Sequence, residues 1–175
     1  MTTTSHTGGF TIVELMVTLA VAAILMGFAL PAFNDFVRQR TMASRINDFV
    51  MAVTYARSEA VRRGGLVSVQ ADAPEADNEW GGGYCVVVGN PGNCPDPADP
   101  EVLRWFGPMS AAEVTFDASP GVETLTFNSR GLPAPQLAAA VAVSLCSVDA
   151  SGDPGRVVNI TVTGRPDTEE LDCHG

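Results

Sequence analysis

The chain has 175 residues, of which 46% are hydrophobic, and its 20 acidic and 10 basic residues give a formal net charge of −10. This length suits one domain with an appendage, and the apolar content is enough for a modest core. All ten basic residues are arginine. The acidic balance repels the nucleic-acid backbone, so the composition disfavours nucleic-acid binding as the main function.

A long uncharged apolar segment occupies the N-terminal part of the chain. No charged residue occurs from Leu15 to Asn34, and a helix of this length just spans a bilayer core of ~30 Å. A secretory signal would start with basic residues and end in a small-residue cleavage site. Residues 1–9 contain no Lys or Arg, and the small pair Gly8-Gly9 precedes the apolar run. We therefore expect residues 10–34 to form the transmembrane half of a helix.

One carboxylate, Glu14, lies just inside this apolar helix. An ionised group is costly in a membrane segment and marks a functional position. It is tolerated where an opposite charge neutralises it. Glu14 therefore needs a partner of opposite charge.

The helical pattern continues beyond the uncharged segment. Apolar residues recur there at spacings of three and four, and Gly64-Gly65 supplies a C-terminal stop. We expect one helix from Phe10 to Arg63, ~80 Å long, whose second half packs on a domain. The apolar positions are Phe33, Phe36, Ile46, Phe49, Val50, Val53, Ala56, Ala60 and Val61.

After Gly65 the pattern changes to short β-prone runs separated by Gly, Pro, Asn and Asp. A long helix followed by antiparallel strands predicts an α+β fold, with one globular domain over residues 35–175 whose helical part ends at about residue 63. The strands are predicted near Leu66–Gln70, Tyr84–Val88, Val102–Phe106, Val114–Phe116, Thr124–Asn128, Ala140–Val148 and Arg156–Thr163.

Four cysteines, Cys85, Cys94, Cys146 and Cys173, lie in the acidic second part of the chain, without the CxxC spacing of a zinc ribbon or redox pair. Their even number downstream of a membrane segment predicts two disulfides in an oxidising compartment. Sequence alone does not choose among the three connectivities. The turn-rich segment between Cys85 and Cys94 favours local pairing, which leaves Cys146 to hold Cys173 and the acidic tail.

The sequence gives little support to an enzyme. Its only histidines are His6, ahead of the apolar run, and His174 near the C-terminus. A His-dependent triad and a multi-His metal site are therefore not expected. The run Gly81-Gly82-Gly83 lacks the Lys-Ser/Thr pair of a phosphate loop. We expect no catalytic residues, no cofactor and no metal.

The segment GGFTIVELMVTLAVAAIL, residues 8–25, resembles the class III signal of type IV pilins and type II secretion pseudopilins. The resemblance implies that residues 1–9 are a leader, that a prepilin peptidase cuts between Gly9 and Phe10, and that Phe10 is then N-methylated. It also implies that Glu14 pairs with the N-terminal amine of a neighbouring subunit during assembly. The leader departs from the family because it lacks basic residues.

Three further segments, ARSEAVRRG at 56–64, WGGGY at 80–84 and FNSRGLP at 127–133, resemble the GspH/FimT/FimU subgroup. The resemblance implies a pilin-like α+β fold, with a long N-terminal helix packed on an antiparallel β-sheet domain. It implies one pass through the inner membrane with the domain in the periplasm, and an extracellular pilus afterward. The implied partners are other major and minor pilins, the prepilin peptidase and the inner membrane. In structural terms, Gly131 suits a positive-φ turn and Trp80 suits the core.

The resemblance leaves three functions open. The first is a minor pilin of the type IV pilus, at or near the filament tip, that helps to initiate assembly. The second is a type II secretion pseudopilin. The third, of a different class, is a DNA-binding minor pilin for DNA uptake. The segment LMVTLAVAAIL is more similar to FimT and FimU than to secretion pseudopilins, which favours the first.

DNA capture depends on an arginine motif in this subgroup, because some FimT-like minor pilins bind DNA through Gly-Arg-x-Arg near the C-terminus. Here the corresponding residues are Gly164-Arg165-Pro166-Asp167, with more acids close behind. One arginine among four acids does not make a surface that releases counterions from phosphates. Arg165 is the candidate DNA contact, and DNA is not expected as a partner.

Overall fold

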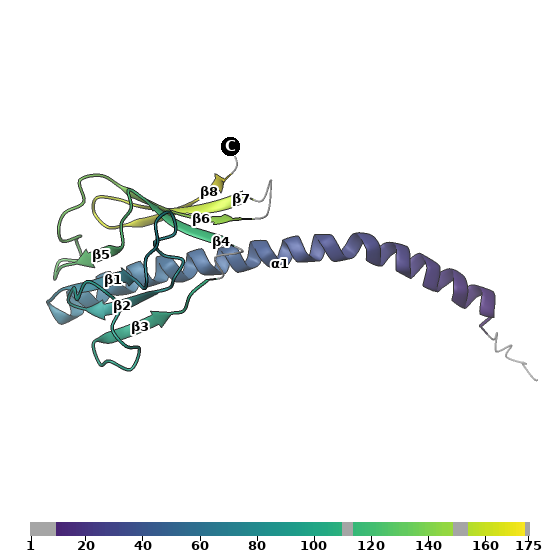
Figure 1. Cartoon of the computed structure of the whole chain (residues 1–175), viewed down its shortest axis with the longest axis horizontal. Helices are drawn as coiled ribbons and strands as arrows, with labels where there is room; N and C mark the ends of the chain where they lie inside the picture. Colours follow the sequence, from purple (N-terminus) through teal and green to yellow (C-terminus); the bar gives the residue numbers. More distant parts are fainter. Residues whose placement is uncertain (1–9, 110–113, 149–153, 174–175) are drawn as a thin grey trace, which may run out of the picture. The chain divides into compact units, whose positions relative to one another are not determined.

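A computed structural model describes residues 10–109, 114–148 and 154–173 (Figure 1). The chain divides into two compact units, Met1–Arg40 and Thr41–Gly175. Helix α1, Ile12–Arg63, belongs to both units. All of the strands belong to the second unit.

The two ends of α1 are set by local capping. Thr11 precedes the helix, and its Oγ1 accepts a hydrogen bond from the amide of Glu14 at 3.2 Å, as expected of an N-cap residue. At the other end Gly64 has a φ of +67°, and Gly65 N–H donates to the carbonyl of Ala60 at 3.2 Å. This is the left-handed C-terminal cap that glycine favours, so the predicted helix end is confirmed.

Two four-stranded antiparallel sheets make up the β part of the second unit, within the described residues. The first has the order β3-β2-β1-β5 and the second the order β4-β6-β7-β8. The first sheet contains β1 Val67–Ala71, β2 Tyr84–Val88, β3 Val102–Phe106 and β5 Thr124–Phe127. The second contains β4 Val114–Ser119, β6 Val141–Ser147, β7 Pro154–Ile160 and β8 Pro166–Asp172.

Phe49 of α1 lies at the centre of the core of this unit. Its ring makes edge contacts with Trp80, with Tyr84 of the first sheet and with Phe116 of the second, at centroid distances of 5.0, 5.3 and 5.1 Å. Residues from α1 and from both sheets belong to one buried cluster. The buried helix residues are Met42, Ile46, Phe49, Ala52, Val53, Ala56 and Ala60.

The predicted α+β order is confirmed, with differences at the edges. Val61, which was assigned to the apolar stripe, is 54% exposed and lies off the buried face. Strand β8 is missing from the sequence prediction. All seven of its residues pair with β7, although most of its side chains are exposed and four of them are acidic.

The segment between β1 and β2 connects the two sheets. Asn78 Oδ1 accepts a hydrogen bond from the amide of Phe116 at 2.8 Å, and the amide of Trp80 donates to the carbonyl of Phe116 at 2.9 Å. Edge strands present unpaired backbone groups that need partners. Residues 78–80, in the connection between β1 and β2, therefore supply hydrogen-bond partners for the edge of β4 that does not face β6.

Candidate functional site

The candidate site is the N-terminal end of α1 next to the predicted cleavage position, where the structure describes Phe10 but not Gly9. Phe10 is 69% exposed, and Ile12 and Val13 after it are also exposed. Thr11 caps the helix, and Glu14 occupies the first turn. A negative side chain there is favoured by the helix dipole, so the capped first turn is a suitable position for Glu14.

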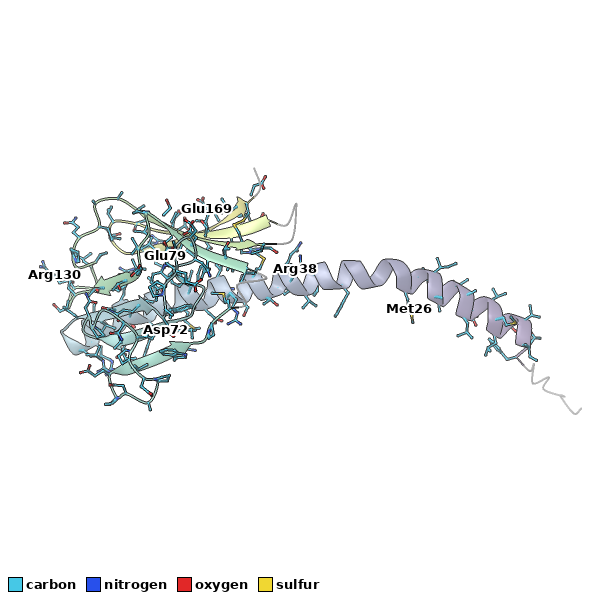
Figure 2. All side chains as sticks on the ribbon, viewed as in Figure 1. Met26, Arg38, Asp72, Glu79, Arg130 and Glu169 are labelled. Carbon is cyan, nitrogen blue, oxygen red and sulfur yellow. A yellow bond between two sulfur atoms is a disulfide. The ribbon has the colours of Figure 1, made fainter. Side chains whose placement is uncertain are left out.

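The first unit, Met1–Arg40, exposes many large apolar side chains, among them Met26, which Figure 2 labels. Large exposed apolar surface that is not covered within a chain marks an interaction surface. No ion pair to Glu14 is found within the described residues. The exposed large side chains are Phe10, Ile12, Val13, Leu15, Met16, Val17, Leu19, Val21, Ile24, Leu25, Met26, Phe33, Phe36 and Val37.

Within the described residues, no helix has the length and apolar character needed to cross a membrane.

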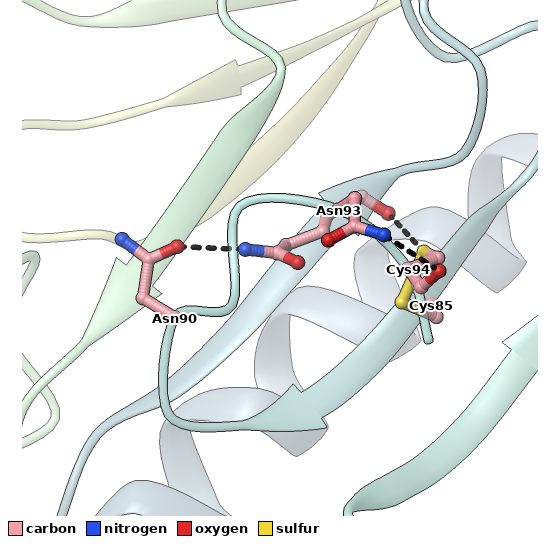
Figure 3. Close-up of a disulfide and its surroundings, with 5 residues drawn as sticks. Cys85, Asn90, Asn93 and Cys94 are labelled. Carbon is pink, nitrogen blue, oxygen red and sulfur yellow. Dashed lines mark hydrogen bonds between the residues drawn. A yellow bond between two sulfur atoms is a disulfide. The ribbon is translucent and has the colours of Figure 1, made fainter. Parts of the chain in front are cut away.

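The cysteines form two disulfides, Cys85–Cys94 and Cys146–Cys173, which is the connectivity that the turn between Cys85 and Cys94 favours. In the first, a loop after β2 folds back over the fully buried Cys85 (Figure 3). Gln70 Nε2 of β1 donates to Asn90 Oδ1 of this loop at 2.7 Å. The second disulfide joins β6 to the residue that follows β8. Both bridges fix loops or edges of the domain.

Arg165 lies in the turn between β7 and β8. Its amide donates to Thr161 Oγ1 at 3.0 Å, and its carbonyl accepts from the amide of Thr161 at 3.0 Å. The side chain is exposed, and the strand that follows carries the exposed acids Asp167, Glu169, Glu170 and Asp172. The absence of a DNA partner stays a prediction.

Of the three segments that carry the subgroup resemblance, the first and third contact each other and the second contributes to the core. Arg57 of the first segment donates from Nε to the carbonyl of Gly131 in the third, at 3.1 Å. Gly131 has a φ of +70°, which confirms the predicted positive-φ turn. Trp80 of the second segment is fully buried against Phe49, as predicted. These residues support the domain.

Sequence reasoning missed one cluster of titratable groups. Glu79 is only 9% exposed, and burial together with the neighbouring carboxyl group of Glu79 raises the pKa of Asp117 to about 6. Both residues look like solvated acids in the sequence, and they lie on segments that only the tertiary fold brings together. The only sign in the sequence that Glu79 is buried is its neighbour Trp80, which is predicted to lie in the core.

A helix with an exposed apolar first part, followed by a domain of antiparallel sheets packed on its second part, defines a pilin-like protein. Residues 45–164 match the family described as Type II transport protein GspH, and residues 4–30 match the prokaryotic N-terminal methylation motif. The chain belongs to the GspH family of type IV minor pilins and type II pseudopilins. Its members are structural proteins rather than enzymes.

Similar proteins come from several bacteria. The pilin-like protein PilA1 of Thermus thermophilus is 31% identical over 161 residues, which are 90% of this chain and 95% of PilA1. A crystal structure of the type IV minor pilin FimU of Pseudomonas aeruginosa is 28% identical, with a TM-score of 0.59 over 77% of this chain and 92% of FimU. A type IV major fimbrial protein FimA of Dichelobacter nodosus is 35% identical over 83 residues, which are 47% of this chain and 44% of FimA.

Proposed function

We propose that this chain is a minor pilin of the type IV pilus, incorporated at or near the filament tip, where it helps to initiate assembly. The observation that carries the proposal is the set of large apolar side chains exposed between Phe10 and Phe36, with Glu14 near its start. The likeness to the minor pilin FimU supports the choice of a minor over a major subunit.

The assembly step follows from the chemistry of this segment. The methylation motif implies processing by a prepilin peptidase, and we place the cut between Gly9 and Phe10. Cutting there creates an amine at Phe10, four residues before Glu14. In a bundle of apolar helices the amine of one subunit and the Glu14 carboxylate of its neighbour neutralise each other, because either charge alone is costly in a low dielectric.

Before assembly, residues 10–34 hold the subunit in the inner membrane and the domain lies in the periplasm. Exposed apolar side chains suit lipid as well as neighbouring helices, so the same surface serves both states. The two disulfides suit an oxidising compartment such as the periplasm. Extraction of the subunit into the filament then exchanges lipid contacts for contacts with other pilins.

The position of the subunit is tested by gold labelling of sheared pili with an antibody to the domain. We expect label at one end of each filament, and fewer pili per cell in a strain that lacks the gene. Label spread evenly along the shaft would contradict the tip position. Absence of the chain from purified pili would contradict the pilus assignment itself.

A type II secretion pseudopilin is the second candidate, because the matching family is described as a type II transport protein. The same deletion strain separates the two functions. Loss of secreted enzymes from the medium with unchanged pili would favour the pseudopilin. Fewer pili with unchanged secretion favours the minor pilin.

A further inference from the structure

The charged residues that follow the apolar part of α1 are mostly basic. Arg38, Arg40 and Arg45 come after the uncharged run, with Asp35 as the only acid among them, whereas residues 1–9 contain no Lys or Arg. Basic residues that flank a membrane segment ordinarily lie on its cytoplasmic side. In the proposed topology the domain is periplasmic, as its two disulfides favour. These arginines are then on the opposite side from the usual one, and they need another role.

Arg40 lies over an exposed aromatic ring. Its guanidinium carbon is 5.0 Å from the ring centroid of Phe36, one turn earlier in α1, and Phe36 is itself 53% exposed. A cation over an aromatic face is attracted by the quadrupole of the ring. The ring suits hydrocarbon and the guanidinium suits phosphate, so the pair matches the boundary between the acyl chains and the headgroups of a bilayer.

Arg38 and Arg40 are both exposed and lie on opposite sides of α1 at nearly the same height. Residues two positions apart in a helix differ by about 200° around its axis and by about 3 Å along it. Arg38 is labelled on the helix in Figure 2. A protein that approaches one side of the helix contacts one of the two arginines, whereas lipid headgroups surround a membrane helix on every side. The arrangement therefore fits lipid better than a single protein surface.

The distance along α1 from Glu14 to Arg40 matches the thickness of a bilayer. The two residues are 26 positions apart in the helix, which is ~39 Å at ~1.5 Å per residue. A bilayer measures ~30 Å across its hydrocarbon core and ~40–45 Å with its headgroups. Glu14 and the arginines are therefore spaced to lie in the two opposite headgroup layers, outside the hydrocarbon that penalises their charges.

We propose that Phe36, Arg38 and Arg40, here called the arginine anchor, bind the phosphate groups of anionic phospholipids on the periplasmic face of the inner membrane before assembly. The guanidinium groups donate hydrogen bonds to phosphate oxygens, and the ring lies among the acyl chains. The arginine anchor sets the depth of the helix, so that Glu14 stays in the opposite headgroup layer until the subunit is extracted. This inference rests on the proposed membrane-held state of the subunit.

The test is lipid retention by the full chain in native mass spectrometry, after release from detergent micelles that contain equal amounts of phosphatidylglycerol and phosphatidylcholine. We expect wild type to retain phosphatidylglycerol preferentially. In Arg38→Gln/Arg40→Gln this preference should fall on the order of thirtyfold, because each arginine near an anionic surface contributes about fivefold. The matched control is Arg130→Gln/Arg165→Gln, which removes two exposed arginines of the domain and should keep the wild-type preference.

Two further measurements keep the test decisive. Arg38→Lys/Arg40→Lys preserves both charges and should preserve most of the preference, since lysine also binds phosphate. An excess of inorganic phosphate should leave the lipid bound, because the free ion has no acyl chains to meet Phe36. The proposal is overturned if Arg38→Gln/Arg40→Gln retains phosphatidylglycerol as wild type does, if the control pair loses as much, or if inorganic phosphate displaces the lipid.

The result for the arginine anchor is distinguishable from the result for the pilus. Lipid retention is measured on the purified chain, so absence of the chain from purified pili would contradict the minor-pilin proposal and leave the arginine anchor standing. Loss of Arg38→Gln/Arg40→Gln from sheared filaments, with the lipid preference of wild type, would instead assign the two arginines to contacts with another pilin and overturn the arginine anchor.

Discussion

The Nε of Arg57 donates a hydrogen bond to the carbonyl oxygen of Gly131, 3.1 Å away and 74 residues further along the chain. This bond ties the last part of α1 to the turn after β5. Gly131 has a left-handed φ, and a Cβ added to it would lie 3.2 Å from Cγ2 of Val61. The turn therefore packs closely against the helix, and the guanidinium of Arg57 makes the polar contact between them.

Replacing Arg57 should destabilise the domain without affecting the assembly segment. Arg57→Met keeps most of the aliphatic stem and removes the donor, and a half-buried charged hydrogen bond of this kind contributes about 1–2 kcal/mol. The check is urea unfolding of the full chain in detergent, followed by tryptophan fluorescence. Arg130→Met, in the same turn but exposed, is the matched control and should change the free energy of unfolding little.

We expect the domain to lose stability in acid because of Glu59. Hydrogen bonds from Arg62 and then from Arg63 lower the pKa of Glu59 to about 2 from an ordinary value of 4.5. Its stabilisation is therefore complete above about pH 4.5 and is lost as the pH falls through about 2. Glu59→Gln should lower the melting temperature at pH 6, and the difference from wild type should vanish toward pH 2. Glu101→Gln, at an exposed loop carboxylate, should leave the pH profile of wild type unchanged.

The disulfide Cys146–Cys173 should hold β8 in place. Its sequence separation of 27 residues corresponds in the chain-entropy model to about 3.5 kcal/mol. In Cys146→Ser/Cys173→Ser we expect a loss of that size and early hydrogen exchange across β8. Removing the Cys85–Cys94 pair instead should leave the exchange of β8 unchanged. Equal protection of β8 in both double variants would show that pairing with β7 is sufficient.

Local patterns were enough to predict most of the fold. Some features depend only on residues that are near one another in the sequence, and these could be predicted. They are the helical period, the glycine stop and the alternation of β-prone runs with turns. Strand β8 was not predicted because its seven residues are mostly polar and exposed. Its β conformation comes from pairing with β7 and from the nearby disulfide, which are tertiary features.

The contact of residues 78–80 with β4 was unpredictable for a related reason. Glu79 and Asp117 are separated in the sequence by β2 and β3, and each resembles an ordinary surface acid. Only the closure of residues 78–80 on β4 brings them together. Glu14, in contrast, was recognisable from the sequence because a lone carboxylate in an apolar helix conflicts with its surroundings. Its role still depends on a neighbour outside the chain.

The mature chain should begin at Phe10 with a methylated amine. Intact-mass analysis of the protein extracted from membranes should give the mass of residues 10–175 with one added methyl group. Gly9→Leu should accumulate uncut, because a bulky side chain replaces the small residue before the cut. A mature chain that begins at Met1, or after Ala29, would contradict the pilin type of processing.

Filament incorporation of Glu14→Ala tests the assembly role most directly. The full-length variant is expressed in a strain that lacks the native copy, and the chain is quantified in sheared filaments and in membranes. We expect its share in filaments to fall on the order of tenfold or more, because the neighbour's amine loses its counter-charge in an apolar bundle. The melting temperature of the detergent-solubilised chain should not change, since Glu14 lies outside the unit that contains the core. Glu101→Ala, an exposed carboxylate of the domain, should be incorporated normally. Wild-type amounts of Glu14→Ala in sheared filaments would contradict the account.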